Sequence, residues 1–214
     1  MLYHEKKAKN RGFSFVIGVD EVGRGPLAGP VVAVAVKLNR VKFNNYINDS
    51  KKLTRLQRER AFLEIIDNAL VGIGIVNELL IDELNILNAT KLAMDKAVNS
   101  LFRASRKKIK QNKAIVLVDG NFSLDLPFKT KNIVRGDSKS LSIASASIVA
   151  KVIRDSIMSD YDSLYPQYSF KDNKGYGTKA HFKAIARYGA CKIHRMSFYP
   201  LNTIKDGQRK NRIG

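Results

Sequence analysis

The sequence predicts an α/β fold, with a sheet covered by helices, because two kinds of hydrophobic pattern alternate along the chain. Runs of β-branched residues, typical of strands, are separated by segments whose apolar residues recur at helical spacing. One run, residues 114–118, is short and entirely apolar, which is typical of a strand buried in a parallel sheet. Strands mixed with intervening helices in this way favour a sheet layered by helices.

The first third of the chain supplies three of the expected strands and one helix. Strands are predicted over residues 13–22 and 29–38, which a Gly/Pro turn joins, and over residues 71–76. Between them, residues 54–68 have helical spacing, and Thr54 can cap the N-terminus of that helix.

The rest of the chain contains the longer helices. The predicted elements are a helix over residues 81–104 with a break near Asn88, strands over 114–118 and 128–134, a helix over 141–158, a loop over 161–178 and a helix over 179–188. We divide the chain into a basic N-terminal segment (1–12), one α/β domain with C-terminal helices (13–200) and a basic, flexible tail (201–214).

The charge of the chain points to a polyanionic partner. Lysine and arginine number 38, against 19 aspartate and glutamate residues, which gives a formal net charge of +19 in 214 residues. Nucleic acid is the leading candidate, because dispersed cations neutralise phosphates and release counterions. The alternative is a composition bias of the source organism.

The compartment is predicted to be the cytoplasm. Cys191 is the only cysteine, so an internal disulfide and a multi-cysteine zinc site are excluded, and we expect a small, buried apolar side chain there. No segment has the apolar length of a signal peptide or of a membrane span. We therefore expect a soluble protein that contacts no membrane.

Acidic residues follow three of the predicted strands. Asp20 and Glu21 end the first strand, Asp119 follows the run at 114–118, and Asp137 follows the next strand. Ligands of α/β sheets bind beyond strand ends, so these acids can converge although they lie far apart in sequence. Alone, Asp119 also fits an Asp-Gly turn, and Asp137 also fits a helix N-terminus.

Four carboxylates in one cleft would repel one another, and oxygen-only ligands suit Mg²⁺ or Mn²⁺. Two such ions can hold a scissile phosphate, activate water and neutralise the leaving oxygen. Little other catalytic machinery is then needed. His4 lies in a start expected to be frayed, and His181 and His194 are expected to be structural or phosphate-contacting histidines.

Two glycine-framed segments are candidate substrate contacts. Gly23, Arg24 and Gly25 could bring backbone groups close to a sugar, or form an ordinary tight turn. Tyr176, between two glycines, could abut a sugar or base, or anchor its loop on the core.

Two further residues stand before predicted helices. Ser50 and Lys51 precede a helix N-terminus, where a phosphate could bind, although a solvated lysine pair is equally plausible. Ser138 precedes the small-residue helix, where packing and a cap are the simpler interpretation.

Seven motifs, in this order along the chain, resemble those of the bacterial ribonuclease HII family, a type 2 ribonuclease H. They are GVDEVGRGPLAGPV (18–31), DSKKL (49–53), VDGN (118–121), GDSK (136–139), SASIVAKVIRD (145–155), KGYGT (174–178) and HRMSF (194–198). The resemblance covers residues 13–200. It implies a ribonuclease-H-like fold, a central mixed five-stranded sheet flanked by helices, with a helical C-terminal extension.

The resemblance also implies an activity: metal-dependent endonucleolytic hydrolysis of RNA in RNA–DNA hybrids, including a single ribonucleotide embedded in duplex DNA. By motif, the acids Asp20, Glu21, Asp119 and Asp137 would bind Mg²⁺ or Mn²⁺ and be catalytic. The other implied contacts are with the ribose 2′-hydroxyl (Gly23, Arg24, Gly25), with the following sugar (Tyr176) and with phosphates (Lys51, Ser138).

Two other functions stay open on the sequence. A non-catalytic nucleic-acid-binding module would explain the basic charge, but four carboxylates would bring it no benefit near phosphates. Another two-metal nuclease, such as a resolvase or transposase, would cleave all-DNA junctions. We expect a monomer whose partners are RNA–DNA hybrids and ribonucleotide-containing DNA.

Overall fold

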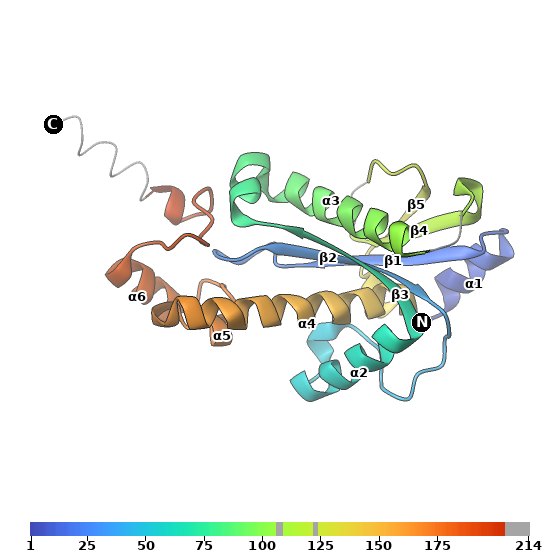
Figure 1. Ribbon diagram of the computed structural model, residues 1–214, viewed down its shortest axis with the longest axis horizontal. Coiled ribbons are helices and arrows are strands. Elements are labelled where there is room, and N and C mark those ends of the chain that lie inside the picture. Colours follow the sequence, from blue (N-terminus) through green and yellow to red (C-terminus); the bar gives the residue numbers. More distant parts are fainter. Residues whose placement is uncertain (106–108, 122–123, 204–214) are drawn as a thin grey trace.

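The strands form one mixed sheet, which is seen nearly edge-on in Figure 1. The computed structural model describes residues 1–105, 109–121 and 124–203. The five strands lie in the order β3-β2-β1-β4-β5. Their bounds are β1 Phe15–Val22, β2 Val31–Leu38, β3 Ala69–Val76, β4 Ala114–Asp119 and β5 Lys129–Ile133. The β1–β2 and β2–β3 pairs are antiparallel, and the β1–β4 and β4–β5 pairs are parallel. The predicted mixed five-stranded sheet is confirmed.

Helices cover both faces of this sheet (Figure 1). The α-helices are α1 Tyr3–Asn10, α2 Arg55–Asn68, α3 Glu78–Ala104, α4 Leu141–Leu164, α5 Phe170–Asn173 and α6 Lys179–Tyr188. Helix α3 packs on one face against a core that includes Ile17, Val19 and Val116. Helices α2 and α4 pack on the other face against residues such as Val32 and Val34. Successive strand residues point to opposite faces, so strands β1 to β4 contribute side chains to the cores on both faces.

Glycines in the strands bring the helices close to the sheet. A Cβ atom at Gly18 would overlap the backbone of Ser142 and Ile143 at the start of α4. A side chain at Gly74 would likewise run into the backbone of α3 at Ala93. The contact at Gly18 lays the first turns of α4 directly across β1, the strand that ends in Asp20 and Glu21.

Several boundaries differ from those expected. The break predicted in α3 is present, but it lies at Asn85, with φ 65° and ψ 163°, three residues before the expected position near Asn88. The Asn85 side chain accepts hydrogen bonds from the backbone N–H groups of Leu87 and Asn88, so it caps the helix that restarts there. Helix α4 continues to Leu164, and the segment predicted as a loop also contains two short helices, Pro166–Tyr168 and α5.

The N-terminal segment is a helix docked on the domain. In α1, Glu5 is buried, and its carboxylate Oε1 accepts from Ser140 Oγ at 2.6 Å and from Ser142 N and Oγ at 2.9 and 2.8 Å. His4 lies within this helix, so the expectation of a frayed start was wrong. The N-terminal segment, residues 1–12, therefore supplies hydrogen-bond acceptors to the N-terminal end of α4.

The C-terminal helices form a smaller cluster at one end of the molecule. Its buried side chains include Met158, Phe170, Ile193 and Leu201, the last of which the sequence placed in the tail. The remainder of that tail, 204–214, lies outside the described residues. None of the helices in the described ranges is long and apolar enough to cross a membrane.

Candidate active site

The four predicted acids meet at one edge of the sheet. Asp20 and Glu21 lie near the end of β1, and Asp119 ends β4, its parallel neighbour. Asp137 lies in the 3₁₀ turn Gly136–Ser138, just after β5. All four line a cavity of about 180 Å³. The convergence expected from their places at strand ends is therefore present.

This cavity concentrates negative charge that the protein compensates poorly. Asp20 is only 5% exposed, and its burial, followed by the charges of Glu21 and Asp119, raises its pKa well above the usual value. Burial also raises the pKa of Glu21, an effect that Arg24 opposes. The pKa of Asp137 is raised by burial and by Asp49 and Asp119. The carboxylates are therefore in a place where a bound cation would be favourable.

The donor atoms fit a divalent metal ion. The four acids offer only oxygen ligands, and Glu21 Oε2 is buried without a hydrogen-bond partner. In the described part of the chain, however, no three His, Cys, Asp or Glu side chains are already grouped as a metal site requires. The mutually repelling carboxylates would therefore have to draw together around an ion.

Helix α4 contributes two side chains to the cavity that the sequence analysis did not single out. Ser147 lines the cavity and lowers the pKa of Asp20, and its Oγ lies 3.0 Å from Ser50 Oγ. Lys151, one turn later, also lines the cavity and pairs with Asp155 at 2.7 Å. The sequence could have indicated these two residues, because Ser147 and Lys151 are four residues apart in one motif and so lie on the same face of the helix.

Two buried arginines hold the backbone of residues 23–30: Arg195 contacts the turn at residues 23–25, and Arg154 contacts the segment that follows it. Arg195 donates to the carbonyl oxygens of Gly23 at 2.6 Å and of Arg24 at 3.0 Å. Arg154 donates to the carbonyls of Ala28 and Pro30 at 3.1 and 3.0 Å. Neither arginine was assigned a role from the sequence, since each acts on backbone far away along the chain.

Gly23 is required at its position for steric reasons. Its φ is +98°, a conformation that L side chains rarely adopt. An added Cβ would also collide with the Arg154 guanidinium and with the Pro30 carbonyl. Arg24 extends from this turn, and its guanidinium lies 3.5 Å from Glu21 Oε1. The turn therefore brings exposed backbone and one guanidinium to the edge of the acidic cavity.

Tyr176 lies next to Gly25 of this turn. Its ring is 44% exposed, lines the cavity and comes within 3.7 Å of the point where a Gly25 Cβ would stand. The Leu27 N–H donates to the Gly175 carbonyl at 2.8 Å, and Arg154 donates to the Lys174 carbonyl at 3.0 Å. The Tyr176 loop (residues 174–178) is thus held against residues 27–30, directly after the turn, by one backbone hydrogen bond and by the Arg154 side chain.

The two candidate phosphate contacts are placed differently. Lys51 is exposed, lines the cavity, and its charge lowers the pKa of Asp137. Ser138 is next to Asp137, but its hydroxyl donates to the Arg135 carbonyl at 2.9 Å, and it does not line the cavity.

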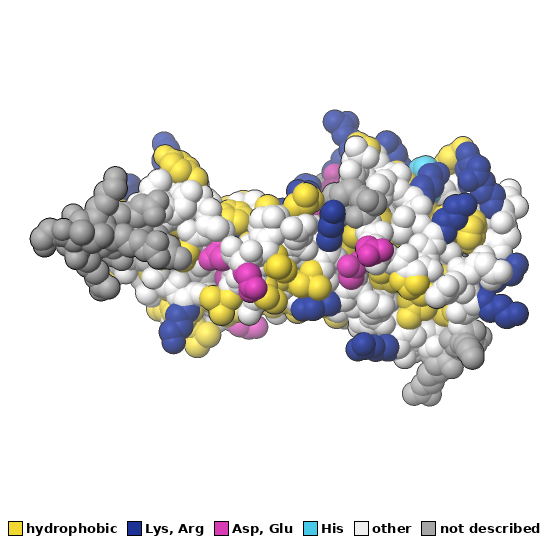
Figure 2. Space-filling view, turned by 90° about the horizontal axis from the view of Figure 1, so that it is seen from above, with side chains coloured by type: hydrophobic (Ala, Val, Ile, Leu, Met, Phe, Trp, Pro, Cys, Tyr) yellow, Lys and Arg dark blue, Asp and Glu magenta, His cyan; other side chains and the backbone are white. Residues whose placement is uncertain are grey.

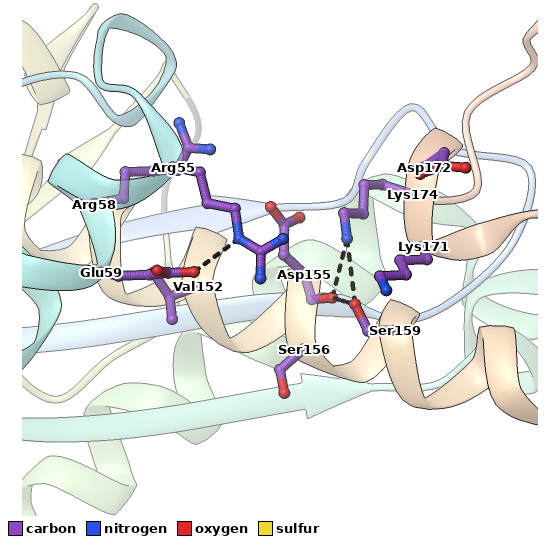
Figure 3. Close-up of a pocket in the computed structure, with 10 residues that line it drawn as sticks. All are labelled: Arg55, Arg58, Glu59, Val152, Asp155, Ser156, Ser159, Lys171, Asp172 and Lys174. Atoms are coloured by element: carbon purple, nitrogen blue, oxygen red, sulfur yellow. Dashed lines mark hydrogen bonds and ion pairs between the residues drawn. The ribbon is translucent and has the colours of Figure 1, made fainter.

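A larger cavity, of about 540 Å³, lies between α2, α4 and α5 (Figure 3). Several of its charged groups already have partners: Arg55 pairs with Glu59 at 2.8 Å, and Lys174 Nζ donates to the Asp155 carbonyl and to Ser159 Oγ. None of the predicted site residues lines it. Its size therefore does not make it the reaction site.

Histidines and the cysteine lie away from the acids. His181 and His194 are buried in the C-terminal cluster, so a structural role is the one that the geometry supports. Cys191 is half-buried, and its Sγ lies 3.1 Å from His194 Nδ1, so the expected buried apolar cysteine was wrong.

The comparisons with known proteins agree with this geometry. The family model described as Ribonuclease HII matches residues 17–200. A Ribonuclease HII of Acetivibrio thermocellus is 52% identical over 199 residues, covering 92% of this chain and 75% of that protein.

Two solved structures share the fold. The ribonuclease H2 of Pyrococcus horikoshii has a TM-score of 0.69 at 26% identity, with 92% of this chain and 99% of that chain covered. Bst-RNase HIII, solved in complex with Mn²⁺, has a TM-score of 0.66 at 16% identity, with 95% and 73% covered. With its acids gathered at the sheet edge and a family match over most of its length, the chain belongs to the ribonuclease HII family, and it is a type 2 ribonuclease H, an endonuclease acting on RNA in RNA–DNA hybrids.

Proposed function

We propose that this ribonuclease is metal-dependent and nicks duplex DNA on the 5′ side of a single embedded ribonucleotide, leaving a 5′-phosphate. The observation that carries the proposal is the placement of the acidic cavity directly beside the turn at residues 23–25 and Tyr176. Hydrolysis and recognition of the sugar can then occur at one phosphodiester bond. The biological use would be ribonucleotide excision repair and removal of hybrids and primers, by a cytoplasmic monomer.

Asp20, Glu21, Asp119 and Asp137 would hold Mg²⁺ or Mn²⁺. The metal would neutralise phosphate charge and lower the pKa of a bound water, which supplies the nucleophile. Support comes from the unpartnered Glu21 Oε2 and the raised pKa values of three of the acids, and from a protein of the same fold solved with Mn²⁺. Ser147 would help to stabilise the ionised Asp20 carboxylate, because it lowers the pKa of Asp20.

Recognition of ribose would fall to Gly23, Arg24 and Gly25. Their backbone can approach a 2′-hydroxyl closely because the glycines carry no Cβ, and Arg195 fixes the direction of two of their carbonyls. Tyr176 would pack on the following sugar and favour a deoxyribose there. Lys51, which lines the cavity, and Ser138, the residue after Asp137, would contact phosphates.

The test is a duplex with one embedded ribonucleotide, incubated with Mg²⁺ or Mn²⁺ and mapped at nucleotide resolution. We expect one nick on the 5′ side, and we expect Asp119→Asn to reduce the rate by orders of magnitude. An all-DNA duplex of the same sequence is the control. If the ribonucleotide-containing duplex is cleaved with neither metal, the proposal is refuted. Cleavage of all-DNA junctions would favour a resolvase-like nuclease instead.

A further inference from the structure

A chain of hydrogen bonds runs from the C-terminal segment to the Tyr176 loop through two buried histidines. The Cys191 N–H donates to His194 Nδ1 at 2.9 Å. His194 Nε2 lies 3.0 Å from His181 Nε2, and His181 Nδ1 lies 2.9 Å from the Tyr176 carbonyl oxygen. His181 and His194 are 0% and 3% exposed, so water does not replace these contacts.

Only one arrangement of protons satisfies every contact in this chain. The backbone N–H of Cys191 can only donate, so His194 Nδ1 carries no proton and His194 Nε2 carries one. His194 Nε2 must then donate to His181 Nε2, which leaves His181 Nδ1–H to donate to the Tyr176 carbonyl. The opposite direction would leave a bare nitrogen facing a carbonyl oxygen.

Both imidazoles must be neutral for this arrangement. Burial, and then the neighbouring His181, lower the pKa of His194 to about 4. Burial also lowers the pKa of His181. A second proton at the Nε2–Nε2 contact would place two N–H donors against each other, so the geometry and the pKa values agree.

The segment of residues 191–195, which contains His194, also contacts the turn at residues 23–25. We call this turn and Tyr176 together the substrate-reading surface. Arg195, the next residue after His194, donates to the carbonyls of Gly23, Arg24 and Gly29. Its backbone N–H also donates to the Leu27 carbonyl at 2.8 Å. Residues 191–195 therefore contact both the turn at residues 23–25 and, through His181, the Tyr176 loop.

We propose that His181 and His194 are positioning residues that fix the Tyr176 loop against the turn at residues 23–25, and so set the preference for a junction between ribose and deoxyribose. This inference rests on the proposed function of Tyr176. Neither histidine lines the acidic cavity, so neither takes part in the hydrolysis itself.

Variants of His181 separate positioning from simple structural support. His181→Asn keeps an amide N–H that can reach the Tyr176 carbonyl, whereas His181→Leu removes the donor. The readout is the ratio of kcat/KM on a single-ribonucleotide duplex to kcat/KM on a hybrid with an all-RNA strand. We expect His181→Leu to lower this ratio about three- to tenfold, the equivalent of one hydrogen bond, and His181→Asn to restore it.

Two controls complete the set. Ile185→Val, buried in the same helix α6, lowers stability without touching the hydrogen-bond chain and should keep the wild-type ratio. In a Tyr176→Ala background, His181→Leu should cause no further loss, since both changes act through the same ring. An unchanged ratio in His181→Leu, or an equal loss in His181→Asn, overturns the inference.

The tautomers offer a test that needs no variant to fold. Nitrogen-15 NMR of the wild-type protein at pH 7 should show His194 protonated at Nε2 and His181 protonated at Nδ1. The opposite tautomer at either ring, or an imidazolium, contradicts the hydrogen-bond chain. A wild-type enzyme with no preference for the single-ribonucleotide duplex would instead refute the proposed function, while leaving the tautomer result interpretable on its own.

Discussion

Asp20 is a residue at which the requirements of stability and function conflict. It is buried beside Glu21 and Asp119, and each of these factors raises its pKa. Its hydrogen-bond partner is the backbone N–H of Glu21, at 2.8 Å, and Ser147 also lowers its pKa, but neither group carries a positive charge. The ionised side chain therefore costs folding free energy at neutral pH, a cost that a bound cation would offset.

Replacing Asp20 with asparagine should abolish cleavage and stabilise the metal-free protein. Asparagine keeps the acceptor oxygen and removes the buried charge, so Tm at pH 7 should rise, by about 2–4 °C for each ~1 kcal/mol gained. Because the folded-state pKa of Asp20 is raised, the gain is present at neutral pH and disappears below the usual value of 3.8, where the unfolded carboxyl is also protonated.

The measurement is thermal unfolding of both proteins in EDTA from pH 7 to pH 3.5, alongside the cleavage assay. Asp160→Asn, an exposed acid on the same helix as Ser147, is the control and should leave Tm and activity unchanged. A lower Tm for Asp20→Asn at pH 7 would contradict the view that the site is strained by its own charge.

At the scale of elements, α1 stabilises the helix that carries Ser147 and Lys151. Glu5 accepts three hydrogen bonds from Ser140 and Ser142 at the N-terminus of α4, where a negative charge also suits the helix dipole. Glu5→Ala should lower stability by ~1–2 kcal/mol, as loss of a helix cap does.

Thermal unfolding of Glu5→Ala against Lys9→Ala, an exposed residue of the same helix, measures this contribution. An equal Tm for the two variants would show that α1 is dispensable for α4. The sequence could not predict this contact, because its partners are more than 130 residues apart and nothing local marks Glu5 as buried.

The elements that the sequence predicted correctly are those with strong local periodicity, such as α2, β2 and α6. The four acids were also predictable, because strand ends in a parallel sheet share an edge. Arg154, Arg195 and the histidine pair were not given roles, since each is defined by backbone carbonyls or rings brought near only by the fold. The restart of α3 at Asn85 is different, because its cap is a local signal whose position was predicted three residues too late.

At the scale of the whole molecule, the chain carries a net charge of +19, and few of its basic side chains line the acidic cavity. In Figure 2, lysine and arginine side chains are scattered over the face in view and are most frequent toward the end where α1 lies. Acidic side chains form small groups nearer the middle of this face. Such a distribution can attract a duplex from many directions but cannot itself distinguish ribose from deoxyribose.

Affinity and selectivity should therefore respond differently to salt. With Asp119→Asn, which should bind without cleaving, the Kd values for an all-DNA duplex and for the same duplex with one ribonucleotide should both rise steeply between 50 and 200 mM KCl. Their ratio should stay constant, since the turn at residues 23–25 and Tyr176 contact sugars rather than release counterions. A fluorescence anisotropy titration over this range measures both values. Kd values that do not change with salt would mean that the excess of basic residues reflects composition alone. A ratio of Kd values that falls to one at high salt would mean that discrimination depends on the surface charge and not on the turn at residues 23–25 and Tyr176.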